Sequence, residues 1–497
     1  MKVQKKAILL GAAMAAVALI TIIALILALV NRQSLEQPFS TKYGVVFDAG
    51  SSHTSLFLYQ WLANKENNTA IVSQKQSCDV EGGGISSYVG NPAGAGESLK
   101  KCLDVAKAII PDKQLKDTPL YLGATAGMRI LNLQNQSQSD SILAEVTKTI
   151  QSYPFDFRGA RILTGMEEGA YSWITANYLL ENFIKHTFEG LWTHPTAGKL
   201  IGALDLGGAS TQISFTPKDP LKDPNSAFHL QLYGYNYELY THSYLCYGQD
   251  QAVKKLQAYL HTNAGASTVI NHPCYHQGYS LNISLGELYN SPCVVQPNNF
   301  NPKGALLFQG TGNASLCYSL MENIVNVTGC ASSPDCGFNG VYQPPVNGEF
   351  YAFAGYFYTF DFLGLAPKAP LTRVLSTIQT HCSKNWTTLL AENPSVKPKY
   401  LRDYCTIAQY IMTILLKGYK FNDSWENISF QKQVAETEIG WTLGYMLNLT
   451  NMIPAERPKT VTGVPHSQWA AEIFFIAFAV FLCVLILLIL FVRDPGH

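Results

Sequence analysis

The chain has 497 residues, which exceeds the usual size of one hydrophobic core and favours two domains or a two-lobed fold. Lysine plus arginine equal aspartate plus glutamate at 35 each, so no charge excess indicates binding to nucleic acid or acidic polymers. Charged residues make up only 14% of the chain and hydrophobic residues 47%, and the apolar excess is concentrated at the two ends.

The first apolar stretch covers residues 7–30 and contains no charged residue. At about 1.5 Å per residue, a helix of this length exceeds the roughly 30 Å hydrocarbon core of a bilayer. A cleaved signal peptide is the alternative interpretation, but the length of the stretch and the lack of a convincing small-x-small cleavage site disfavour it. We therefore predict a transmembrane helix that follows a short tail of residues 1–6.

The second apolar stretch, residues 473–492, is uninterrupted, and Trp469 precedes it where an interfacial aromatic belongs. We predict a transmembrane helix over residues 469–492 and a short tail over 493–497. Lysines precede the first span and Arg493 follows the second, so the positive-inside rule places both tails in the cytoplasm and the intervening chain outside. The spans contact the lipid bilayer and could also pair between copies as a homo-oligomer.

Cysteine usage agrees with an external location. Of 11 cysteines, Cys483 falls within the second span, and the ten between the spans predict five disulfides in an oxidising compartment. Proximity along the chain favours the pairs Cys78–Cys102, Cys330–Cys336 and Cys382–Cys405. The remaining four allow three connectivities: Cys246, Cys274, Cys293 and Cys317. Because no CxxC pairs occur, a zinc site is disfavoured.

Asn-x-Ser/Thr acceptors also lie between the spans, as expected for a glycosylated ectodomain. They are Asn67, Asn135, Asn282, Asn313, Asn326, Asn385, Asn422, Asn427 and Asn448.

A short motif, DAGSSHT, occupies Asp48–Thr54 between two strand-like runs. The polar residues 31–42 form a tether, after which the apolar run Tyr43–Phe47 leads into Asp48, and Ser55–Tyr59 resumes the strand pattern. This arrangement predicts a turn between two hairpin strands and not the strand–helix connection of a P-loop.

A second motif, DLGGAST at Asp205–Thr211, repeats this arrangement, with strand-like residues 200–204 before it and 212–215 after it. The two motifs share Asp, Gly and Thr at their first, third and seventh positions. Such a repeat predicts two related lobes that face one cleft. Helical patterns are predicted at residues 95–110, 140–152, 168–188 and 404–419, long disulfide-stapled loops after residue 216, and a second tether at 454–468.

Both motifs have the composition of a phosphate-binding loop. Glycine allows the backbone to turn tightly and approach a ligand, so that amide N–H groups and Ser/Thr hydroxyls can surround phosphate oxygens. The leading carboxylates, Asp48 and Asp205, are suited to hold a divalent cation or its waters beside the phosphates. Two ordinary glycine-containing hairpins are the alternative, which the duplication disfavours.

Two further segments contain candidate site residues. Residues 122–129 read as a strand end and a turn in which Thr125 offers a hydroxyl and Arg129 a salt bridge, although a plain strand–turn–helix connection fits equally well. Glu167 and Glu168 open a helix, where carboxylates commonly favour the macrodipole. Glu168 is the better candidate for a general base that aligns water, because the glycine after it leaves the approach open.

The remaining candidates have plain structural alternatives. Trp441 and Gln212 lie beside glycine-containing turns, where packing and strand hydrogen bonding are their default roles. His53 lies inside the first loop and is more suited to contact phosphate than metal, because the histidines show no metal-ligand spacing.

Five segments resemble those of the ecto-nucleoside triphosphate diphosphohydrolases, a family of cell-surface apyrases. They are DAGSSHT, ATAGMR, EEGAYSWITANY, DLGGASTQ and EIGWTLG, in the order of the family and spanning Asp48 to Gly444. The resemblance implies an α/β, actin-like (ribonuclease H-like) two-lobed ectodomain. It implies a first lobe at residues 31–164, a second at 165–432, and a return to the first lobe with the tether at 433–468.

The resemblance also implies roles for individual residues. Glu168 would be the catalytic base, and Tyr356 the aromatic face of a base-binding site. A Ca²⁺ or Mg²⁺ ion would be held mostly through waters by Asp48, Glu168, Asp205, Gln212 and Trp441. Contacts with the nucleotide phosphates would come from Ser51, Ser52, His53, Thr125, Gly208, Ala209, Ser210, Thr211 and Gln212. The family's disulfide pattern would pair Cys246 with Cys293 and Cys274 with Cys317.

The activity implied is hydrolysis of the terminal phosphates of extracellular nucleotides such as ATP, ADP, UTP and UDP, by direct attack of a water that Glu168 activates. Such an activity would act in purinergic signalling. A phosphotransferase with the same fold is one alternative, which the spans and glycosylation sequences oppose. A nucleotide-binding glycoprotein without hydrolysis is another, which the presence of Asp48, Glu168 and Asp205 opposes.

Overall fold

A computed structural model describes residues 2–30, 33–188, 191–195, 199–298, 300–327, 335–457, 459–464 and 466–493. The chain divides into two compact units, Met1–Ser40 with Glu456–His497, and Thr41–Ala455. The lobe boundaries expected within the second unit remain a prediction.

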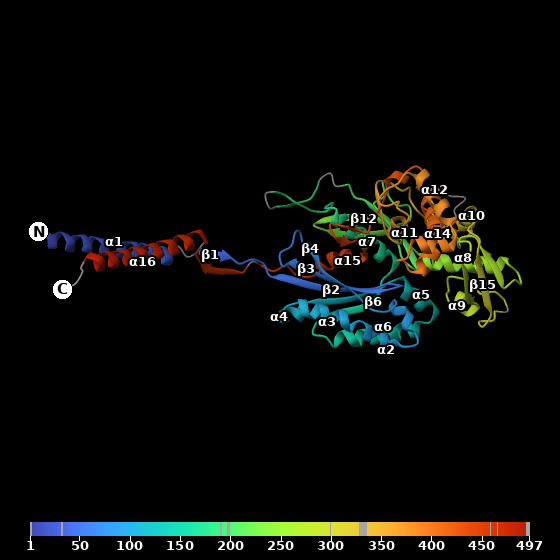
Figure 1. The fold of residues 1–497 in the computed structure, drawn as a ribbon, viewed down its shortest axis with the longest axis horizontal. Coiled ribbons are helices and arrows are strands. Elements are labelled where there is room, and N and C mark those ends of the chain that lie inside the picture. The colour runs from blue at the N-terminus through green and yellow to red at the C-terminus, as the bar shows by residue number, and fades with distance from the viewer. Residues whose placement is uncertain are drawn as a thin grey trace. The chain divides into compact units, whose positions relative to one another are not determined.

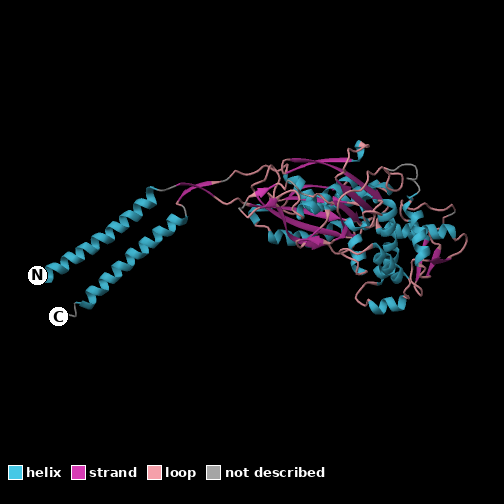
Figure 2. Cartoon of the chain, turned by 90° about the horizontal axis from the view of Figure 1, so that it is seen from above, coloured by secondary structure: helices cyan, strands magenta, loops and turns pink. Residues whose placement is uncertain are grey.

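The first unit contains two long helices, α1 (Lys2–Val30) and α16 (His466–Arg493), which pack against each other. Figure 2 shows them side by side with the two termini at the same end. Within them, residues 8–26 and 466–486 are long and apolar enough to cross a membrane. Strands β1 (Gln33–Glu36) and β20 (Thr460–Gly463) pair antiparallel next to the helices.

The second unit contains a five-stranded sheet in the order β4–β3–β2–β5–β6. Figure 1 labels β4, β3, β2 and β6 of this sheet. Its strands are β2 (Thr41–Ala49), β3 (Thr54–Leu62), β4 (Val72–Asp79), β5 (Pro119–Ala124) and β6 (Asp156–Ile162). Strands β2 and β3 form an antiparallel hairpin, whereas β5 and β6 continue parallel to β2. Successive side chains alternate between faces, so Val45 and Phe47 enter one hydrophobic core and Val46 enters another.

Helices cover the face of this sheet that carries Val45 and Phe47. They and their neighbours are η1 (Ile85–Tyr88), α2 (Pro92–Ser98), α3 (Lys100–Ile109), α4 (Asp112–Leu115), α5 (Ala126–Gln134) and α6 (Gln136–Gln151).

A six-stranded sheet has the order β11–β12–β10–β9–β16–β17. Its strands are β9 (Gly202–Leu206), β10 (Ser210–Phe215), β11 (Ala227–Leu232), β12 (Tyr235–Leu245), β16 (Phe350–Ala354) and β17 (Ile428–Phe430). Here too an antiparallel hairpin, β9–β10, is extended by parallel strands, β16 and β17. The two sheets therefore repeat one arrangement, as the repeated motif predicted.

Helices α7 (Gly165–Leu179) and α15 (Trp441–Thr450) pack against each other and share one core with both sheets. The two helices approach each other closely at Gly444, whose backbone N–H donates to the Thr175 side-chain oxygen Oγ1 at 2.9 Å. A Cβ at this position would lie 2.0 Å from the carbonyl oxygen of Tyr171, so only glycine fits without movement of a helix.

The region after residue 216 is largely regular structure, which corrects the expectation of long loops. Its helices, most of which cover the other face of the six-stranded sheet, are α8 (Gln249–Asn263), α9 (Leu285–Tyr289), α10 (Ala314–Val325), α11 (Gly355–Phe362), α12 (Leu371–Cys382), α13 (Trp386–Glu392) and α14 (Pro398–Thr413). A small sheet with its own core contains β13 (Val269–His272), β14 (Ser280–Ser284) and β15 (Ala305–Gly310). Shorter elements are β7 (Lys185–His186), β8 (Trp192–Thr193), η2 (Pro224–Ser226), η4 (Ile414–Gly418), η5 (Trp425–Asn427), β18 (Gln433–Val434) and β19 (Thr437–Glu438).

The four predicted helices are present, but their bounds differ from those expected. The helix predicted over 140–152 is α6, which begins earlier, at Gln136. The helix predicted over 168–188 is α7 and ends at Leu179, because the chain turns at Glu181, which has a left-handed φ of 57°. The segment 95–110 is divided at Leu99 into α2 and α3. The helix predicted over 404–419 is α14, which begins earlier, at Pro398, and passes into the π-helical turn η4.

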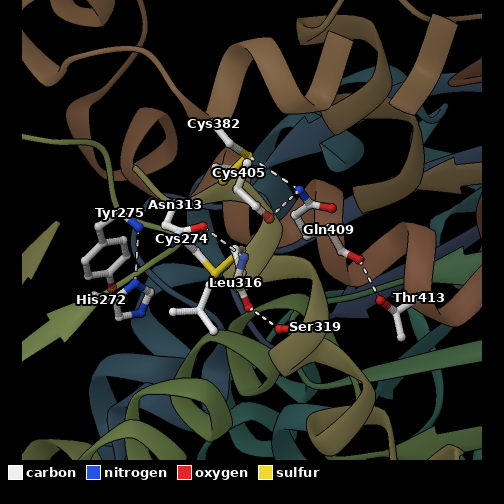
Figure 3. Close-up of a disulfide and its surroundings, with 12 residues drawn as sticks. His272, Cys274, Tyr275, Asn313, Leu316, Ser319, Cys382, Cys405, Gln409 and Thr413 are labelled. Carbon is white, nitrogen blue, oxygen red and sulfur yellow. Dashed lines mark hydrogen bonds between the residues drawn. A yellow bond between two sulfur atoms is a disulfide. The ribbon is translucent and has the colours of Figure 1, made fainter. Parts of the chain in front are cut away.

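Four disulfides match predicted pairs: Cys78–Cys102, Cys246–Cys293, Cys274–Cys317 and Cys382–Cys405. Figure 3 shows that the last two lie close together, where Gln409 of α14 donates a hydrogen bond to the carbonyl of Ala314. Of the fifth predicted pair, Cys336 is disulfide-bonded and Cys330 lies outside the described residues. Cys483 is a free, exposed cysteine.

Candidate active site

A cavity of about 460 Å³ lies where the two hairpin loops meet, and several predicted site residues line it. These are Asp48, Ser51, Ser52, His53, Thr125, Glu168, Asp205, Ala209, Ser210 and Trp441. They come from both sheets, from the β5–α5 turn and from the first turns of α7 and α15. The structure thus gathers segments that are far apart in the sequence.

The two loops occupy equivalent places in their hairpins. Asp48 lies on β2 opposite Ser55 of β3, and Asp205 lies on β9 opposite Gln212 of β10. Each aspartate therefore sits near the end of a strand, just before a glycine-containing turn. Sequence reasoning predicted both turns as hairpin connections, and the strand pairing confirms this.

The loops approach each other across the cavity at Gly208. A Cβ on this residue would lie 2.7 Å from Ser51 Oγ of the first loop and 2.6 Å from Asp250 Oδ2 of α8. Any larger residue would have to displace one of these side chains. The glycine therefore permits the close approach of the two loops, which is what a shared phosphate site requires.

Glu167 and Glu168 have different environments, although they are adjacent in the sequence. Glu167 completes a capping box with Thr164: its carboxylate accepts from the Thr164 backbone N–H at 2.9 Å, and its own N–H donates to Thr164 Oγ1 at 3.2 Å. Arg161 also pairs with it at 2.7 Å. Glu167 therefore stabilises the start of α7, which was the alternative role for both glutamates. Glu168 is the one of the two that lines the cavity.

Glu168 is only 8% exposed, and neighbours fix its orientation. Its Oε2 accepts hydrogen bonds from Arg129 Nη2 at 2.7 Å and Gln212 Nε2 at 3.1 Å. Arg129 also donates to the carbonyl of Leu163 and to Ser210 Oγ, both at 3.1 Å. The other carboxylate oxygen, Oε1, accepts no hydrogen bond from any described residue. Glu168 is thus held by one oxygen and leaves the other available to a water.

Burial and mutual repulsion favour the protonated forms of the neighbouring aspartates. Burial raises the pKa of Asp48 to about 7, and the negative charge of Glu168 adds to this effect. The pKa of Asp205 is raised well above its usual range, first by burial and then by the charges of Glu168 and Asp48. A cation in the cavity would relieve this repulsion, and its binding would favour the ionised carboxylates.

The residues present fit a hydrated divalent cation. Among the described residues, no group of three or more His, Cys, Asp or Glu side chains converges as a direct metal cage. Three buried polar atoms, Asp48 Oδ1, Gln212 Oε1 and Trp441 Nε1, nevertheless lack a well-formed hydrogen bond, although the Trp441 side chain lies close enough to Asp48 to lower the pKa of that carboxyl in part. Waters bound to a cation would supply these partners, since buried polar groups rarely remain unpaired.

Some predicted site residues lie behind the second loop and not at the cavity. Thr211 is buried, and its hydroxyl donates to the carbonyl of Asp205 at 2.7 Å. Tyr356 is fully buried, with its hydroxyl 3.1 Å from Thr211 Oγ1. Its ring is therefore not presented to a nucleotide base in this structure. Gln212 holds the carboxylate of Glu168 by a hydrogen bond. Gly208 contributes by having no side chain, which lets the two loops approach each other.

Among the cavity-lining residues that sequence reasoning missed, four have titratable side chains: Asp79, Tyr358, Lys432 and Glu438. Asp79 accepts a hydrogen bond from Ser55 Oγ at 2.8 Å. Glu438 begins the segment EIGWTLG, so its position in that motif was the available signal. Lys432 and Tyr358 belong to no recognised motif, and only the fold brings them to the site.

Comparison with known proteins agrees with this geometry. Residues 34–462 match the GDA1/CD39 (nucleoside phosphatase) family. The chain is 52% identical to ectonucleoside triphosphate diphosphohydrolase 8 of Gallus gallus, over 93% of each chain. It is 48% identical to the Homo sapiens protein of the same name, over 92% of each chain. It is 47% identical to ectonucleoside triphosphate diphosphohydrolase 2 of Mus musculus, over 95% of each chain.

The fold also has a counterpart among solved structures. A nucleoside triphosphate hydrolase from Neospora caninum superposes with a TM-score of 0.58, at 16% identity, over 85% of this chain and 94% of that one. The two mixed sheets that each begin with a hairpin, with α7 and α15 in their common core, form the actin-like α/β architecture that the resemblance implied.

Proposed function

The chain belongs to the GDA1/CD39 (nucleoside phosphatase) family and is an apyrase-type hydrolase of phosphoanhydride bonds, and from this we propose that it hydrolyses the terminal phosphates of extracellular nucleoside tri- and diphosphates. ATP, ADP, UTP and UDP are the proposed substrates. The observation that supports a hydrolytic role is the carboxylate of Glu168, which lines the cavity with one oxygen fixed and the other without a partner among the described residues.

In the proposed reaction, Glu168 Oε1 accepts a proton from a water as the water oxygen bonds to the terminal phosphorus. The bond from that phosphorus to the bridging oxygen breaks, and the shortened nucleotide leaves with the bridging oxygen. Amide groups and hydroxyls of the two loops, including Ser51 and Ser210, would stabilise the charge on the transferring group. Arg129 and Gln212 keep Glu168 oriented toward the water.

A Ca²⁺ or Mg²⁺ ion, when bound, would offset the negative charge of the phosphates. We propose that Asp48, Asp205, Glu168, Gln212 and Trp441 hold the waters of this ion. The buried atoms of Asp48, Gln212 and Trp441 that lack a well-formed hydrogen bond support this set. Ser52, His53, Thr125 and Ala209, which line the same cavity, are the further proposed phosphate contacts, whereas Thr211 supports the second loop from behind.

We further propose that the second unit is a glycosylated ectodomain of a plasma-membrane protein with both termini in the cytoplasm. The helices α1 and α16 support this topology because they pack with their termini at the same end (Figure 2). Seven of the asparagines in the glycosylation sequences are exposed, and Asn427 and Asn448 are half-buried. Exposure is what attachment of a bulky glycan requires.

The test compares the full-length protein with its Glu168→Gln variant, in membranes supplied with ATP and Ca²⁺ or Mg²⁺. We expect metal-dependent phosphate release that falls by about 10²- to 10⁴-fold in the variant. Glu167→Gln is the matched control, because glutamine also completes a capping box and the rate should change little. A wild-type protein that releases no phosphate would support the alternative of a nucleotide-binding glycoprotein. Intact cells given ATP outside would test which side of the membrane the cavity faces.

A further inference from the structure

Acidic side chains outnumber basic ones in the lining of the cavity, which is proposed to receive phosphates. Its described lining includes five carboxylates: Asp48, Asp79, Glu168, Asp205 and Glu438. The cationic side chain in the same lining is Lys432, and His53 is the one histidine. A nucleoside triphosphate is a polyanion, so it would meet repulsion here that bound cations and Lys432 must offset.

A short hairpin fixes Lys432 at the cavity. Strands β18 and β19 pair Gln433 with Glu438, and the backbone N–H of Ile439 donates to the Lys432 carbonyl at 3.0 Å. The two turn residues, Ala435 and Glu436, have φ values of 48° and 66°, which is typical of a tight I′ hairpin turn. The hairpin leads directly into Trp441, and it places Lys432 in the cavity lining near Glu438 and Tyr358 of α11.

The ammonium group of Lys432 lies at the cavity, and its contacts with neighbouring side chains are long. Its Nζ lies 3.7 Å from Glu438 Oε1, which is beyond a normal hydrogen bond, and 5.9 Å from the ring centre of Tyr358. Tyr358 in turn donates its hydroxyl to Glu438 Oε1 at 3.2 Å. The Lys432 and Glu438 side chains are 43% and 46% exposed, so a ligand in the cavity can reach them.

We propose that Lys432 binds the phosphate chain of the nucleotide, and that Glu438 and Tyr358 are positioning residues that keep its ammonium group at the cavity. This inference rests on the proposed function and names a binding residue for it. A lysine suits the role because its compact charge sits on a flexible stem and carries three donors. Phosphate oxygens would provide the short, charge-assisted hydrogen bonds that the 3.7 Å contact with Glu438 does not.

The kinetic test uses the full-length protein and measures KM and kcat for ATP at fixed metal concentration. Lys432→Met should raise KM by about tenfold or more, while kcat changes much less, because a ground-state contact is lost. Lys432→Arg keeps the charge and should recover most of the affinity. Lys100→Met is the matched control, because Lys100 lies on α3, forms an exposed pair with Glu97 and does not line the cavity. Salt should raise KM less steeply in Lys432→Met than in the wild type.

A binding test separates this inference from the proposed function. A fluorescent ATP analogue is titrated into the Glu168→Gln variant and into the same variant with Lys432→Met added. Weaker binding in the double variant would support the role of Lys432 even if hydrolysis were never observed. Equal binding and an unchanged KM, in a variant whose thermal unfolding matches the wild type, would overturn the inference and leave the proposed function standing. If Lys432→Met does not fold, Lys432→Gln takes its place in both tests.

Discussion

Replacing Gly444 by alanine is expected to lower both the stability of the protein and its rate of catalysis, because this glycine sets the separation of α7 and α15. The new Cβ would lie 2.0 Å from the carbonyl oxygen of Tyr171 and 3.0 Å from Ile174 Cβ. Ordinary contacts of this kind are 3.4–4 Å. Because the closest neighbour is backbone, no side-chain rotation can relieve the clash, and the helices must move apart by about 1 Å or more.

The net cost follows from three contributions. Overpacking costs about 1–3 kcal/mol, and a weakened hydrogen bond from the Gly444 N–H to Thr175 costs about 1 kcal/mol more. The better helix propensity of alanine returns about 1 kcal/mol. We therefore expect a net loss of about 1–3 kcal/mol. Glu168 lies in the first turn of α7 and Trp441 begins α15, so a displacement of about 1 Å between the helices would lower kcat by up to about 100-fold.

The assay is thermal unfolding of the purified full-length protein together with kcat for ATP. Gly90→Ala is the control, because a Cβ at Gly90 would meet nothing within 4 Å. The control should match the wild type in both measurements. A Gly444→Ala variant that also matched the wild type would refute the argument, since it would show that the two helices can separate without cost to the fold or the site.

Three further outcomes are expected. Arg129→Lys should lower kcat by about tenfold or more, because lysine cannot hold Glu168 Oε2, Ser210 and Leu163 together; an unchanged kcat would contradict a positioning role. Tyr356→Phe should cost about 0.5–1.5 kcal/mol in thermal unfolding, because Thr211 loses a buried hydroxyl partner, and a variant as stable as the wild type would argue against this contact. Burial lowers the pKa of His272 to about 3, so the unfolded chain takes up a proton first as the pH falls below about 6.5. The unfolding free energy should therefore fall by about 3 kcal/mol between pH 7 and pH 4 from this group, and His272→Asn should show a shallower pH dependence.

The two hairpin loops could be predicted from the sequence because their chemistry is local. Glycines within a run of small residues, between two β-type runs, determine a tight turn whatever the rest of the chain does. The roles of Glu167 and Glu168 could not be separated in this way. Both lie in the first turn of the same helix. Glu167 is the capping residue because Thr164 and Arg161 lie beside it, and Glu168 is the residue in the cavity, where Arg129 holds it.

Tyrosines on α11 show a second limit. Tyr356 and Tyr358 are two residues apart on a helix, so they point in nearly opposite directions. Tyr356 is fully buried, whereas Tyr358 is 48% exposed and lines the cavity. Which of the two faces the ligand depends on how α11 packs against the sheet, and neither residue type nor spacing contains that information. Lys432 is similar, because its place at the cavity depends on pairing within a hairpin and on the neighbours of that hairpin.

Pairing of β1 with β20 joins the segments that connect residues 41–455 to the two apolar helices. The unit that contains the cavity is therefore attached at both of its ends, and each attachment is continuous with its own helix. A protease that cuts one connection leaves the other intact, and the cut strand still has a partner to hold it. If α1 and α16 both lie in a membrane, as proposed, release of the unit that contains the cavity would require two separate cleavages, and a single cut would leave it attached through the other helix.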